Sequence, residues 1–460
     1  MTARDNMQKI HFIGIGGIGT SALARYYLAT GWSVSGSDAS DSSLLHALAD
    51  EGVRVFLGED ANNLDDDADR VVYSEAIITK PDLSKEENLM ANPELAKART
   101  LGIENLSYPH ALAELFNAKQ FGVAVTGSHG KSTTTAMLGT ILSRTGGSAL
   151  AGTLVPAFGG RNILVDSHSE IFAIEACEYK RSFLAYHPTI TVITNIDLDH
   201  LDYYRDLEDY ISAFRSLCAQ TRDYVVIAAT DAHSAKLAQE LPNAVRVYDS
   251  YYSVPDLVSG DFQMFSIPAL DLRVKGEHML ADARLAYVTA RLLGIEESIV
   301  VSALESYSGS WRRAEIVGTT AQGNIIMSDY GHHPNEIRPT LAAIKEANPE
   351  KKLVVCFEPH QYSRTIELLD GFLSSFDDAD LLIIPSIYFS RDKHEDVEAM
   401  PAKRFVSLLQ EKYPHTVYGE GLENTSTWLS RYDEQHPDTS IILLLGAGAV
   451  DSLREGFEYC

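Results

Sequence analysis

Short apolar runs alternate with longer amphipathic stretches along the chain. The runs are rich in Val, Ile and Leu and end in glycine or polar residues, a pattern typical of strands in a buried parallel sheet. They lie at residues 9–15, 32–38, 53–56, 70–73, 123–126, 171–175, 189–194, 224–229, 324–329, 352–357, 381–384 and 441–445. Amphipathic stretches at residues 21–30, 131–145, 207–220 and 279–293 have the spacing of helices. We therefore expect an α/β fold with mostly parallel sheets.

The length of the chain and the grouping of these elements predict several domains. A chain of 460 residues corresponds to about three domains at about 150 residues each. The first group of strands closes near residues 108–115, and a new α/β group begins near Ser310. We expect three domains, over residues 1–117, 118–310 and 311–460.

The strongest chemical signal is the stretch Val123-Ala-Val-Thr-Gly-Ser-His-Gly-Lys-Ser-Thr-Thr-Thr135. An apolar strand runs into a glycine turn, and Lys131 and Ser132 begin the helix that follows. Backbone N–H groups in such a turn, with the positive end of the helix, bind phosphate oxygens. In this pattern Lys131 reaches the terminal phosphates and Ser132 holds Mg²⁺. Val125 stands where the full signature has glycine, so the stretch is the shortened form T-G-x-x-G-K-S, with ATP as the leading ligand.

The position of Lys131 on a loop leads to an expectation about stability. Exposed loop lysines rarely support a core, so we expect that loss of Lys131 lowers turnover by several orders of magnitude and leaves the protein folded. The alternative is a glycine turn that only ends a strand and binds nothing.

A second glycine turn follows the first apolar run. The spacing is Gly14-x-Gly16-x-x-Gly19, and Asp38 ends the next predicted strand. This is a dinucleotide-type fingerprint, in which glycines let a diphosphate approach the backbone and the acidic residue accepts ribose hydroxyls. It predicts a nucleotide diphosphate ligand and leaves the nucleotide open.

Polar residues follow two strands of the middle group. Glu175 and Glu178 follow one strand, and Asn195, Asp199 and His200 follow another. Ligands of open α/β sheets bind at the carboxyl ends of the strands, so we expect these side chains at a site. The alternative for Glu175 and His200 is that they cap a neighbouring helix.

Polar clusters also follow two strands of the last group. One is Asp329-Tyr330-Gly-His332-His333-Pro334, and the other is Glu358-Pro-His360-Gln361-Tyr362-Ser-Arg364-Thr365. Adjacent side chains point apart in most conformations, so we expect ligand positioning or loop hydrogen bonding from His332 and His333 rather than a metal site.

Charge and cysteine content exclude several classes of function. A formal net charge of -26 repels nucleic acid and anionic membranes, so we expect no nucleic-acid partner. No apolar run approaches the roughly 20 residues of a membrane span, and residues 1–8 are too polar for a signal peptide. Four cysteines without C-x-x-C spacing indicate neither a zinc site nor a disulfide framework. We expect a cytoplasmic protein without membrane insertion, as a monomer or homodimer.

Taken together, these stretches resemble the motifs of the Mur ligases, in the family order and nearly end to end. The matching stretches are residues 14–38, 126–135, 175–178, 194–200, 329–334 and 359–365. The resemblance implies a Rossmann-like N-terminal domain for a UDP-sugar, a central P-loop ATPase domain with a mostly parallel sheet and a Rossmann-like C-terminal domain. It also implies ATP and Mg²⁺ as cofactors. The chain is most similar to the branch that joins L-alanine to the lactyl carboxylate of UDP-N-acetylmuramate in peptidoglycan precursor synthesis.

The resemblance also implies roles for individual residues. The catalytic residues would be Lys131, Glu175, Asn195, His200 and Arg364, and the metal ligands Ser132, Glu175 and His200. ATP would be bound by Gly127, Ser128, His129, Gly130, Lys131, Ser132, Thr133, His278, Asp282 and Arg313. The UDP-sugar would be bound by Gly14, Gly16, Gly17, Ile18, Gly19, Ser37, Asp38 and Ser74. Tyr330, His333 and Arg364 would line the amino-acid side of the site.

Some positions depart from the family pattern. Asp282 stands where the family has an amide, Gln361 replaces one of two arginines near the amino acid, and Glu75 replaces a serine. Some Mur ligases hold Mg²⁺ with a carbamylated lysine shortly after the Asp-His motif, whereas residues 201–220 contain no lysine. We therefore expect activity to be insensitive to bicarbonate.

Other functions stay open on the sequence alone. One is a ligase that attaches a preformed tripeptide to the same sugar acid, another is a nicotinamide-dependent oxidoreductase that uses the first glycine turn, and a third is a nucleotide-gated regulator. The central phosphate loop argues against the oxidoreductase. The presence of Lys131, Glu175 and His200 argues against the regulator.

Overall fold

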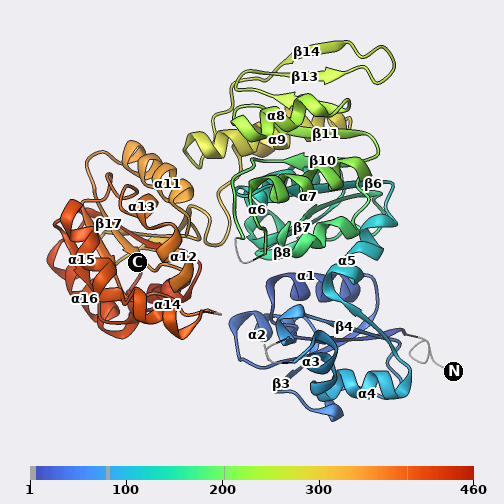
Figure 1. Cartoon of the computed structure of the whole chain (residues 1–460), viewed down its shortest axis with the longest axis horizontal. Helices are drawn as coiled ribbons and strands as arrows, with labels where there is room; N and C mark the ends of the chain where they lie inside the picture. The colour runs from blue at the N-terminus through green and yellow to red at the C-terminus, as the bar shows by residue number, and fades with distance from the viewer. Residues whose placement is uncertain (1–6, 79–82, 201–202, 391) are drawn as a thin grey trace. The chain divides into compact units, whose positions relative to one another are not determined.

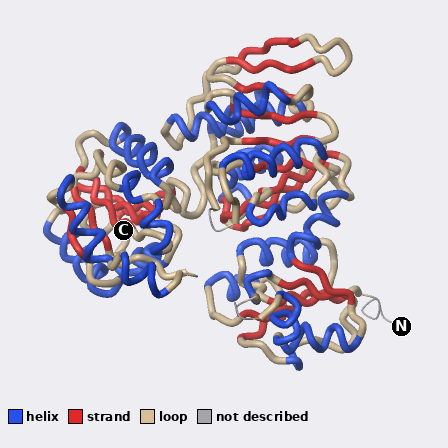
Figure 2. Tube along the Cα trace, in the orientation of Figure 1, coloured by secondary structure: helices blue, strands red, loops and turns tan. Residues whose placement is uncertain are grey.

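The computed structural model describes residues 7–78, 83–200, 203–390 and 392–460, which form two compact units (Figure 1). The first unit comprises Met1–Leu270 and Ala281–Glu305, and the second comprises Asp271–Leu280 and Ser306–Cys460. The first six residues of the polar start, and residues 201 and 202 of the lysine-free stretch, lie outside the described residues. Figure 2 shows strands flanked by helices in each unit.

The first unit begins with a parallel five-stranded sheet in the order β3-β2-β1-β4-β5. Its strands are β1 (Lys9–Ile13), β2 (Ser33–Asp38), β3 (Arg54–Leu57), β4 (Arg70–Tyr73) and β5 (Glu104–Ser107). Its helices are α1 (Ile18–Ala29), α2 (Ser43–Asp50), α3 (Lys85–Ala91), α4 (Pro93–Leu101) and α5 (Tyr108–Asn117). α1 begins at Ile18 rather than at residue 21, because the glycine turn itself supplies the N-cap, Gly17.

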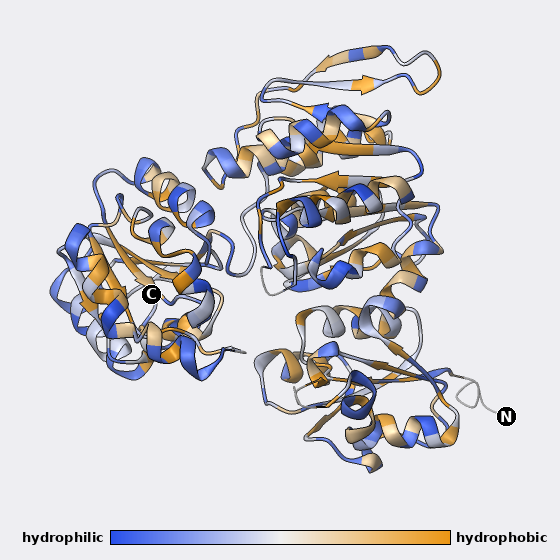
Figure 3. Cartoon of the chain, in the orientation of Figure 1, coloured by the Kyte–Doolittle hydropathy of each residue, from blue (hydrophilic) through white to orange (hydrophobic). Residues whose placement is uncertain are grey.

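A nine-stranded sheet follows, in the order β14-β13-β12-β11-β10-β6-β9-β7-β8. Its strands are β6 (Phe121–Thr126), β7 (Ser148–Val155), β8 (Arg161–Leu164), β9 (Ile171–Glu175), β10 (Ile190–Ile193), β11 (Tyr224–Ala228), β12 (Ala244–Val247), β13 (Tyr251–Pro255) and β14 (Phe262–Ser266). The strands from β12 to β7 are parallel, whereas β8 and the β13–β14 hairpin pair antiparallel at the edges. β10 and β11 are drawn mostly in hydrophobic colours in Figure 3, as expected for buried strands.

The helices around this sheet are α6 (Lys131–Thr145), α7 (Leu207–Gln220), α8 (Ala232–Glu240), α9 (Glu277–Leu292) and α10 (Glu297–Glu305). α6, α7 and α9 agree with the sequence expectations in type and nearly in length, whereas α8 and α10 were not predicted. α6 ends at Gly146, whose φ of +91° favours glycine. The sequence placed the start of α9 two residues too late.

The two sheets of the first unit share one hydrophobic cluster. Tyr26 on α1 stacks on Phe172 of β9, with ring centroids 5.8 Å apart. A buried polar contact joins α1 to β8 of the same sheet, because Arg25 Nη1 donates to Asn162 Oδ1 at 2.8 Å. The boundary at residue 117 therefore crosses a continuous core, and the division into three domains at residues 117 and 310 stays a prediction.

The second unit is built on a six-stranded sheet in the order β15-β16-β20-β17-β18-β19. Its strands are β15 (Glu315–Thr319), β16 (Ile325–Asp329), β17 (Lys352–Phe357), β18 (Leu381–Ile384), β19 (Thr416–Tyr418) and β20 (Ser440–Leu445). All are parallel except β15 at the edge. Its helices are α11 (Pro334–Ala347), α12 (Tyr362–Glu367), α13 (Leu369–Phe372), α14 (His394–Ala399), α15 (Ala402–Lys412) and α16 (Leu422–Gln435).

The α/β fold with mostly parallel sheets is confirmed. Each of the three sheets carries one of the predicted polar edges, since the glycine turn, the phosphate loop and the Asp329–Pro334 cluster all follow a parallel strand. Within the described part of the chain, no helix has the length and apolar character needed to cross a membrane.

Candidate functional site

The first glycine turn connects β1 to α1 at the carboxyl edge of the five-stranded sheet. Gly14 has a φ of +76°, and a Cβ there would lie 2.9 Å from Ser74 Cβ. The Gly14 N–H donates to Ser37 O at 2.8 Å. α1 then begins at Ile18, and its N-cap, Gly17, supplies no side-chain acceptor. The first N–H groups of α1 and the helix dipole therefore favour an anion at this turn.

Asp38 closes the same turn from the end of β2. Its Oδ2 accepts the Gly16 N–H at 2.8 Å, and its Oδ1 accepts the Ser40 N–H at 3.1 Å. The fold thus gathers the residues predicted to bind the UDP-sugar: Gly14, Gly16, Gly17, Ile18, Gly19, Ser37, Asp38 and Ser74. Asp38 also holds the turn in shape, which the sequence did not predict, and its contact with a ribose stays a prediction.

The phosphate loop follows β6, which lies in the middle of the nine-stranded sheet between β10 and β9. Gly127 and Gly130 have φ of +132° and +79°, so both occupy backbone conformations that favour glycine. Gly130 is the N-cap of α6 and supplies no side-chain acceptor. Ser132 and Thr133, in the first turn of α6, are buried. An uncapped helix N-terminus directly after a glycine turn is an arrangement that binds phosphate.

Residues after β10 hold this loop in shape. Asn195 Oδ1 accepts the His129 N–H at 2.9 Å, and Asn195 Nδ2 donates to His129 O at 3.0 Å. Ser128 Oγ donates to Asp197 O at 2.5 Å and accepts the Asp197 N–H at 2.8 Å. The structure therefore places Asn195 against the loop backbone, and its contact with a transferring phosphoryl group stays a prediction.

Lys131 is enclosed by its own loop and by Glu178. Its Nζ donates to Gly127 O at 2.5 Å and to Ser128 O at 3.0 Å, and lies 3.1 Å from Glu178 Oε2. The Lys131 side chain is only 14% exposed and that of Glu178 is 0% exposed. The expectation of an exposed loop lysine is therefore wrong, because the loop folds Lys131 onto a buried carboxylate.

The two charges shift each other's pKa. Burial alone would lower the pKa of Lys131, but nearby negative charges, that of Glu178 the largest, and the hydrogen bond to Glu178 together outweigh burial and raise that pKa. Burial alone would raise the pKa of Glu178, but the charge of Lys131 and a hydrogen bond from His200 hold it below its usual range. Both groups are therefore charged near neutral pH.

Glu178 also contacts His200, which follows β10. His200 Nε2 lies 3.4 Å from Glu178 Oε1, and the Tyr210 hydroxyl donates to the same oxygen at 3.3 Å. His200 has a φ of +57°, a strained conformation for a residue with a side chain, and its N–H donates to Asp199 Oδ1 at 2.6 Å. Such strain is concentrated at functional sites. The structure therefore brings Lys131, Glu178 and His200 into one cluster.

Glu175 has different partners. Its Oε2 accepts the Gly152 N–H of β7 at 2.7 Å, and a Cβ at Gly152 would lie 2.6 Å from the same oxygen. Its negative charge still contributes to the raised pKa of Lys131. Glu175 is thus held at the edge of the cluster by the backbone of β7 rather than as the cap of a helix.

His278 and Asp282, one helical turn apart on α9, belong to different units. Asp282 is buried against the phosphate loop, where a Cβ at Gly130 would lie 2.4 Å from Asp282 Oδ1. His278 belongs to the second unit and lines a cavity there. The predicted contacts of both residues with ATP stay predictions.

In the second unit, two arginines flank Tyr330. The Cζ atoms of Arg312 and Arg313 lie 5.0 and 4.9 Å from the centroid of the Tyr330 ring. Arg312 is buried, and its Nη2 donates to Gly448 O at 3.1 Å. Burial lowers the pKa of Arg312. Arg312 thus supports the loop, whereas the half-buried Arg313, the predicted ATP contact, lies against Tyr330.

His333 caps α11, directly after β16. Its Nδ1 accepts the Asn335 N–H at 3.2 Å, and Glu336 Oε2 accepts the N–H groups of His332 and His333 at 3.0 and 3.2 Å. The loop hydrogen bonding expected of the paired histidines is present. A contact of His333 with the amino acid stays a prediction.

Arg364 lies on α12, one turn after Gln361. Gln361 has a φ of +73°, and its Nε2 donates to Ser390 O at 2.7 Å. The residue that replaces the family arginine therefore holds the neighbouring loop. Arg364 is half buried, and its catalytic role stays a prediction.

Glu178 was expected at the site without a role of its own, and no role was predicted for Arg312. Glu178 ends the motif Glu175-Ala-Cys-Glu178, so a second carboxylate three residues after the first was the available signal. For Arg312 the adjacent arginine was the signal, but only the structure shows which of the two is buried.

The chain matches three family models, in chain order. They are the Mur ligase family, catalytic domain, over residues 9–120; the Mur ligase middle domain, over residues 125–256; and the Mur ligase, glutamate ligase domain, over residues 312–448.

Individual proteins resemble the chain along almost its whole length. The UDP-N-acetylmuramate–L-alanine ligase of Clostridium novyi is 33% identical over 99% of this chain and 98% of its own. That of Alkaliphilus metalliredigens is 35% identical over 96% of this chain and 95% of its own. The crystal structure of the UDP-N-acetylmuramate-alanine ligase of Thermotoga maritima, 24% identical, has the same fold with a TM-score of 0.76 and covers 97% of both chains. The chain therefore belongs to the Mur ligase family.

Proposed function

We propose that this chain is an ATP-dependent ligase that joins L-alanine to the lactyl carboxylate of UDP-N-acetylmuramate, in peptidoglycan precursor synthesis. The observation that carries the proposal is the cluster of Lys131, Glu178 and His200 at the phosphate loop. Relatives of that name, which match over nearly their full length, support the choice of substrates.

The reaction needs an activated acid, because a carboxylate and an amine do not condense usefully in water. A lactyl carboxylate oxygen attacks the γ-phosphorus of ATP, and the electron pair of the broken P–O bond leaves with ADP, which gives an acyl phosphate. The amine nitrogen then attacks the carbonyl carbon, loses a proton, and inorganic phosphate leaves with its bonding pair. Positioning and charge neutralisation supply most of the acceleration in such transfers.

The phosphate loop supplies that neutralisation. The carbonyls of Gly127 and Ser128 keep Lys131 Nζ over the loop, where the terminal phosphates of a nucleotide would bind. Glu178 keeps Lys131 protonated, so its charge is available when negative charge moves between oxygens. The uncapped N-terminus of α6 adds backbone donors on the same side.

Mg²⁺ fits the donors at this loop. Magnesium prefers oxygen ligands, and the Ser132 hydroxyl and the Glu175 carboxylate would supply them, with His200 as a third ligand. Glu178 Oε2 is buried and, beyond its ion pair with Lys131, accepts no hydrogen bond from the described residues, so it is a further candidate oxygen. When bound, the ion would neutralise phosphate charge.

The remaining assignments extend the proposal to the whole chain. We assign UDP-sugar binding to residues 1–117, ATP binding to residues 118–310, and the amino-acid side to residues 311–460 with Tyr330, His333 and Arg364. We place the enzyme in the cytoplasm as a monomer or homodimer. The uncapped turn before α1 supports the UDP-sugar assignment, and the charged side chains near Tyr330 support the amino-acid assignment.

Phosphate release from ATP tests the proposal directly. The full chain would be assayed with Mg²⁺ and UDP-N-acetylmuramate, with each amino acid or a preformed tripeptide offered in turn. We expect release above background with L-alanine and none when the sugar nucleotide is omitted. Faster release with the tripeptide would assign the chain to the recycling reaction, and reduction of a nicotinamide cofactor without phosphate release would overturn the ligase proposal.

A further inference from the structure

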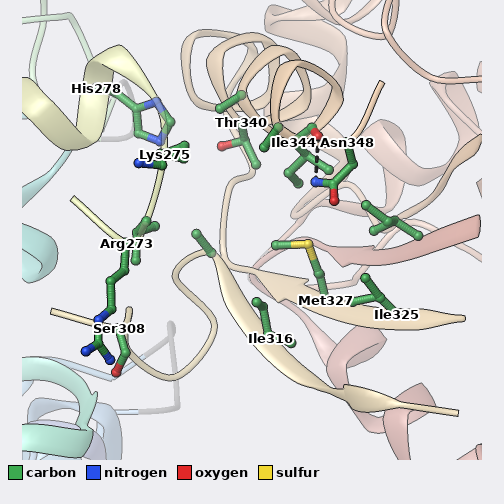
Figure 4. Close-up of a pocket in the computed structure, with 15 residues that line it drawn as sticks. Arg273, Lys275, His278, Ser308, Ile316, Ile325, Met327, Thr340, Ile344 and Asn348 are labelled. Carbon is green, nitrogen blue, oxygen red and sulfur yellow. Dashed lines mark hydrogen bonds between the residues drawn. The ribbon is translucent and has the colours of Figure 1, made fainter. Parts of the chain in front are cut away.

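The second unit contains a cavity of about 310 Å³, shown in Figure 4. The strand residues Ile325 and Met327 of β16 line one side, and Ile344 and Ala347 of α11 line another. Residues 273–278, where the chain passes through the second unit before α9 continues in the first, complete it. The volume is at the lower end of the roughly 300–1,000 Å³ of pockets that bind small molecules.

This cavity is separate from the part of the site predicted to bind the amino acid. It lies against Ile325 and Met327, in the first half of β16, and against the last turns of α11. Tyr330 and His333 follow the other end of β16, and neither they nor Arg364 line the cavity.

The polar lining of the cavity has one sign of charge. Arg273 and Lys275 line it, and no aspartate or glutamate does, although the chain carries a net charge of -26. Arg273 is exposed and forms no ion pair with the residues that the structure describes. Lys275 Nζ lies 2.8 Å from Asp271 Oδ1, but both side chains are exposed, and such pairs contribute little. The cavity is therefore a positive site on an acidic protein.

His278 adds a polar atom without a partner. Its Nδ1 is buried and forms no hydrogen bond with the described residues. Burial lowers the pKa of His278, which favours the neutral imidazole. Figure 4 shows Arg273, Lys275 and His278 along one side of the cavity, and Asn348, whose Nδ2 donates to Ile344 O at 3.0 Å, on the other. A buried polar atom without a partner costs free energy that a ligand can recover.

We propose that this cavity binds a small amphipathic anion. Its flat apolar body would lie between Met327 and α11, its acidic group would pair with Arg273 and Lys275, and a polar atom of the body would hydrogen-bond to His278 Nδ1. A purely inorganic anion would leave the apolar walls uncovered, and a neutral apolar molecule would leave Arg273 without an ion pair among the described residues. His278 is also a predicted ATP contact, whereas Arg273, Lys275 and Met327 have no individual role predicted in the ligase reaction.

Fluorescence titration with a matched pair of probes tests the site. The probes are 1-anilinonaphthalene-8-sulfonate and N-phenyl-1-naphthylamine, which share the apolar body and differ in the sulfonate. Both would be titrated into the full chain in the presence of saturating ATP and Mg²⁺, so that a nucleotide site is not available to them. We expect the sulfonate to bind more tightly than the neutral probe, at one site per chain.

Substitutions locate the binding. The double variant Arg273→Ala, Lys275→Ala should weaken binding of the sulfonate probe by about tenfold, which is the scale of one charge-assisted contact. Binding of the neutral probe should weaken by less than about twofold. Ala347→Phe, at an exposed position of α11, should fill the cavity and weaken the binding of both probes. Arg431→Ala, which removes an exposed arginine elsewhere in the second unit, is the matched control and should change neither.

A site-specific signal decides the case. The chain has eight methionines, and the ¹³C-methyl resonance of Met327 can be assigned by comparison with Met327→Leu. The Met327 resonance should shift as the sulfonate is added and should not shift in Ala347→Phe, with melting temperatures showing that every variant is folded. The proposal would be overturned if the Met327 resonance does not shift when the sulfonate probe is added. It would also be overturned if the unsubstituted protein and Ala347→Phe bind the sulfonate probe with equal affinity.

Discussion

Lys131 and Glu178 stabilise each other, because each carries a charge that is buried away from water. Their side chains are 14% and 0% exposed, and Nζ lies 3.1 Å from Oε2. Removing one partner of a buried pair leaves the other charge without compensation, at a cost of about 3–5 kcal/mol. Replacing both by neutral groups of similar shape removes that cost. The pair therefore links the stability of the loop to its chemistry.

This pair separates a catalytic effect from a structural one. Lys131→Met should lower turnover by several orders of magnitude, because its charge serves the transferring phosphate, and should also lower the free energy of unfolding by about 3 kcal/mol. Adding Glu178→Gln should restore most of the stability and none of the turnover. Urea unfolding and phosphate release measure the two effects, with Arg431→Met and Glu434→Gln as exposed controls. A double variant no more stable than Lys131→Met would show that the two charges do not stabilise each other.

The pH dependence of stability follows from the same pair. The pKa of Glu178 is lowered, so its contribution is present above about pH 4.3, the ordinary glutamate value, and is lost as pH falls through the folded value. The pKa of Lys131 is raised, so its contribution is full below about pH 10.4 and is lost as pH rises through the folded value. The stability difference between the chain and the double variant should be constant between these limits. If this difference in the free energy of unfolding changes between about pH 6 and 9, groups other than Lys131 and Glu178 cause the pH dependence.

At the residue scale, the sequence identified the chemistry and not the packing. Lys131 and His200 were recognisable because their motifs require those residue types at those positions. The burial of Lys131 depends on where Glu178 lies, and the φ of +57° at His200 depends on the turn after β10. The sequence shows only that Gln361 stands where the family has an arginine. Its hydrogen bond to Ser390 could not be predicted, because Ser390 lies on a loop that follows another strand. Such contacts are set by residues far apart in the chain.

At the element scale, α4 controls the shape of the first glycine turn. Glu94 on α4 is fully buried, and its Oε2 accepts from Ser37 Oγ at 2.6 Å and lies 3.0 Å from His11 Nε2. Its Oε1 accepts from Asn63 Nδ2 at 2.8 Å. Burial would raise the pKa of Glu94, but these donors lower it. Since Ser37 O accepts the N–H groups of Gly14 and Ile15, Glu94 positions the turn through Ser37.

Glu94→Gln should therefore affect one substrate and not the others. A hydrogen bond to a buried charge contributes about 1.5–3 kcal/mol, so we expect the KM for the sugar nucleotide to rise about tenfold or more. The KM for ATP should stay within about twofold, because the phosphate loop has other supports. Glu104→Gln, at an exposed carboxylate of β5, is the control. Steady-state kinetics measures both values, and an equal rise in the two KM values would show a general loss of folding instead.

α7 bears on the question of a carbamylated lysine. Leu207–Gln220 contains no lysine, but Lys180 lies near the cluster, since its Nζ is 5.2 Å from the centroid of the Tyr179 ring, which is 4.7 Å from that of His200. The Lys180 side chain is exposed rather than enclosed by the cluster. We expect turnover after degassing at mildly acidic pH to be unchanged by bicarbonate, and Lys180→Arg to keep it within about twofold. A carbamate at Lys180 would be identified if the unsubstituted protein loses turnover on degassing and regains it with bicarbonate, whereas Lys180→Arg shows no such loss.

The elements themselves were predictable where local chemistry defines their ends. α6 begins at Lys131 after a glycine turn and ends at Gly146, and α7 has a polar start and a regular apolar stripe, so the predicted bounds of both agree with the structure. The start of α1 was placed too late, because the helix begins at Ile18, inside the glycine motif and before its last glycine, Gly19. The β13–β14 hairpin was not predicted, since every residue of β14 is exposed and no burial pattern marks it.

At the scale of the whole molecule, the two units have cores that can be changed separately. Ile193 of β10 is fully buried in a cluster drawn from residues 10–244, and Leu443 of β20 is fully buried in a cluster drawn from residues 325–445. The sequence predicted the α/β class and the parallel sheets from the strand pattern alone. It could not show that residues 1–117 share a core with the central sheet, because contacts such as Tyr26 with Phe172 join elements far apart in the chain.

Separate cores predict unfolding in more than one step. Chains with several cores commonly depart from two-state behaviour, so calorimetry should resolve two transitions. Ile193→Ala and Leu443→Ala each remove a buried side chain at a cost of about 2–5 kcal/mol, and each should lower a different transition. Hydrogen exchange read by mass spectrometry assigns the transitions, because peptides from β10 and from β20 should lose protection separately. A single transition that both variants lower equally would show that the two units unfold as one cooperative structure.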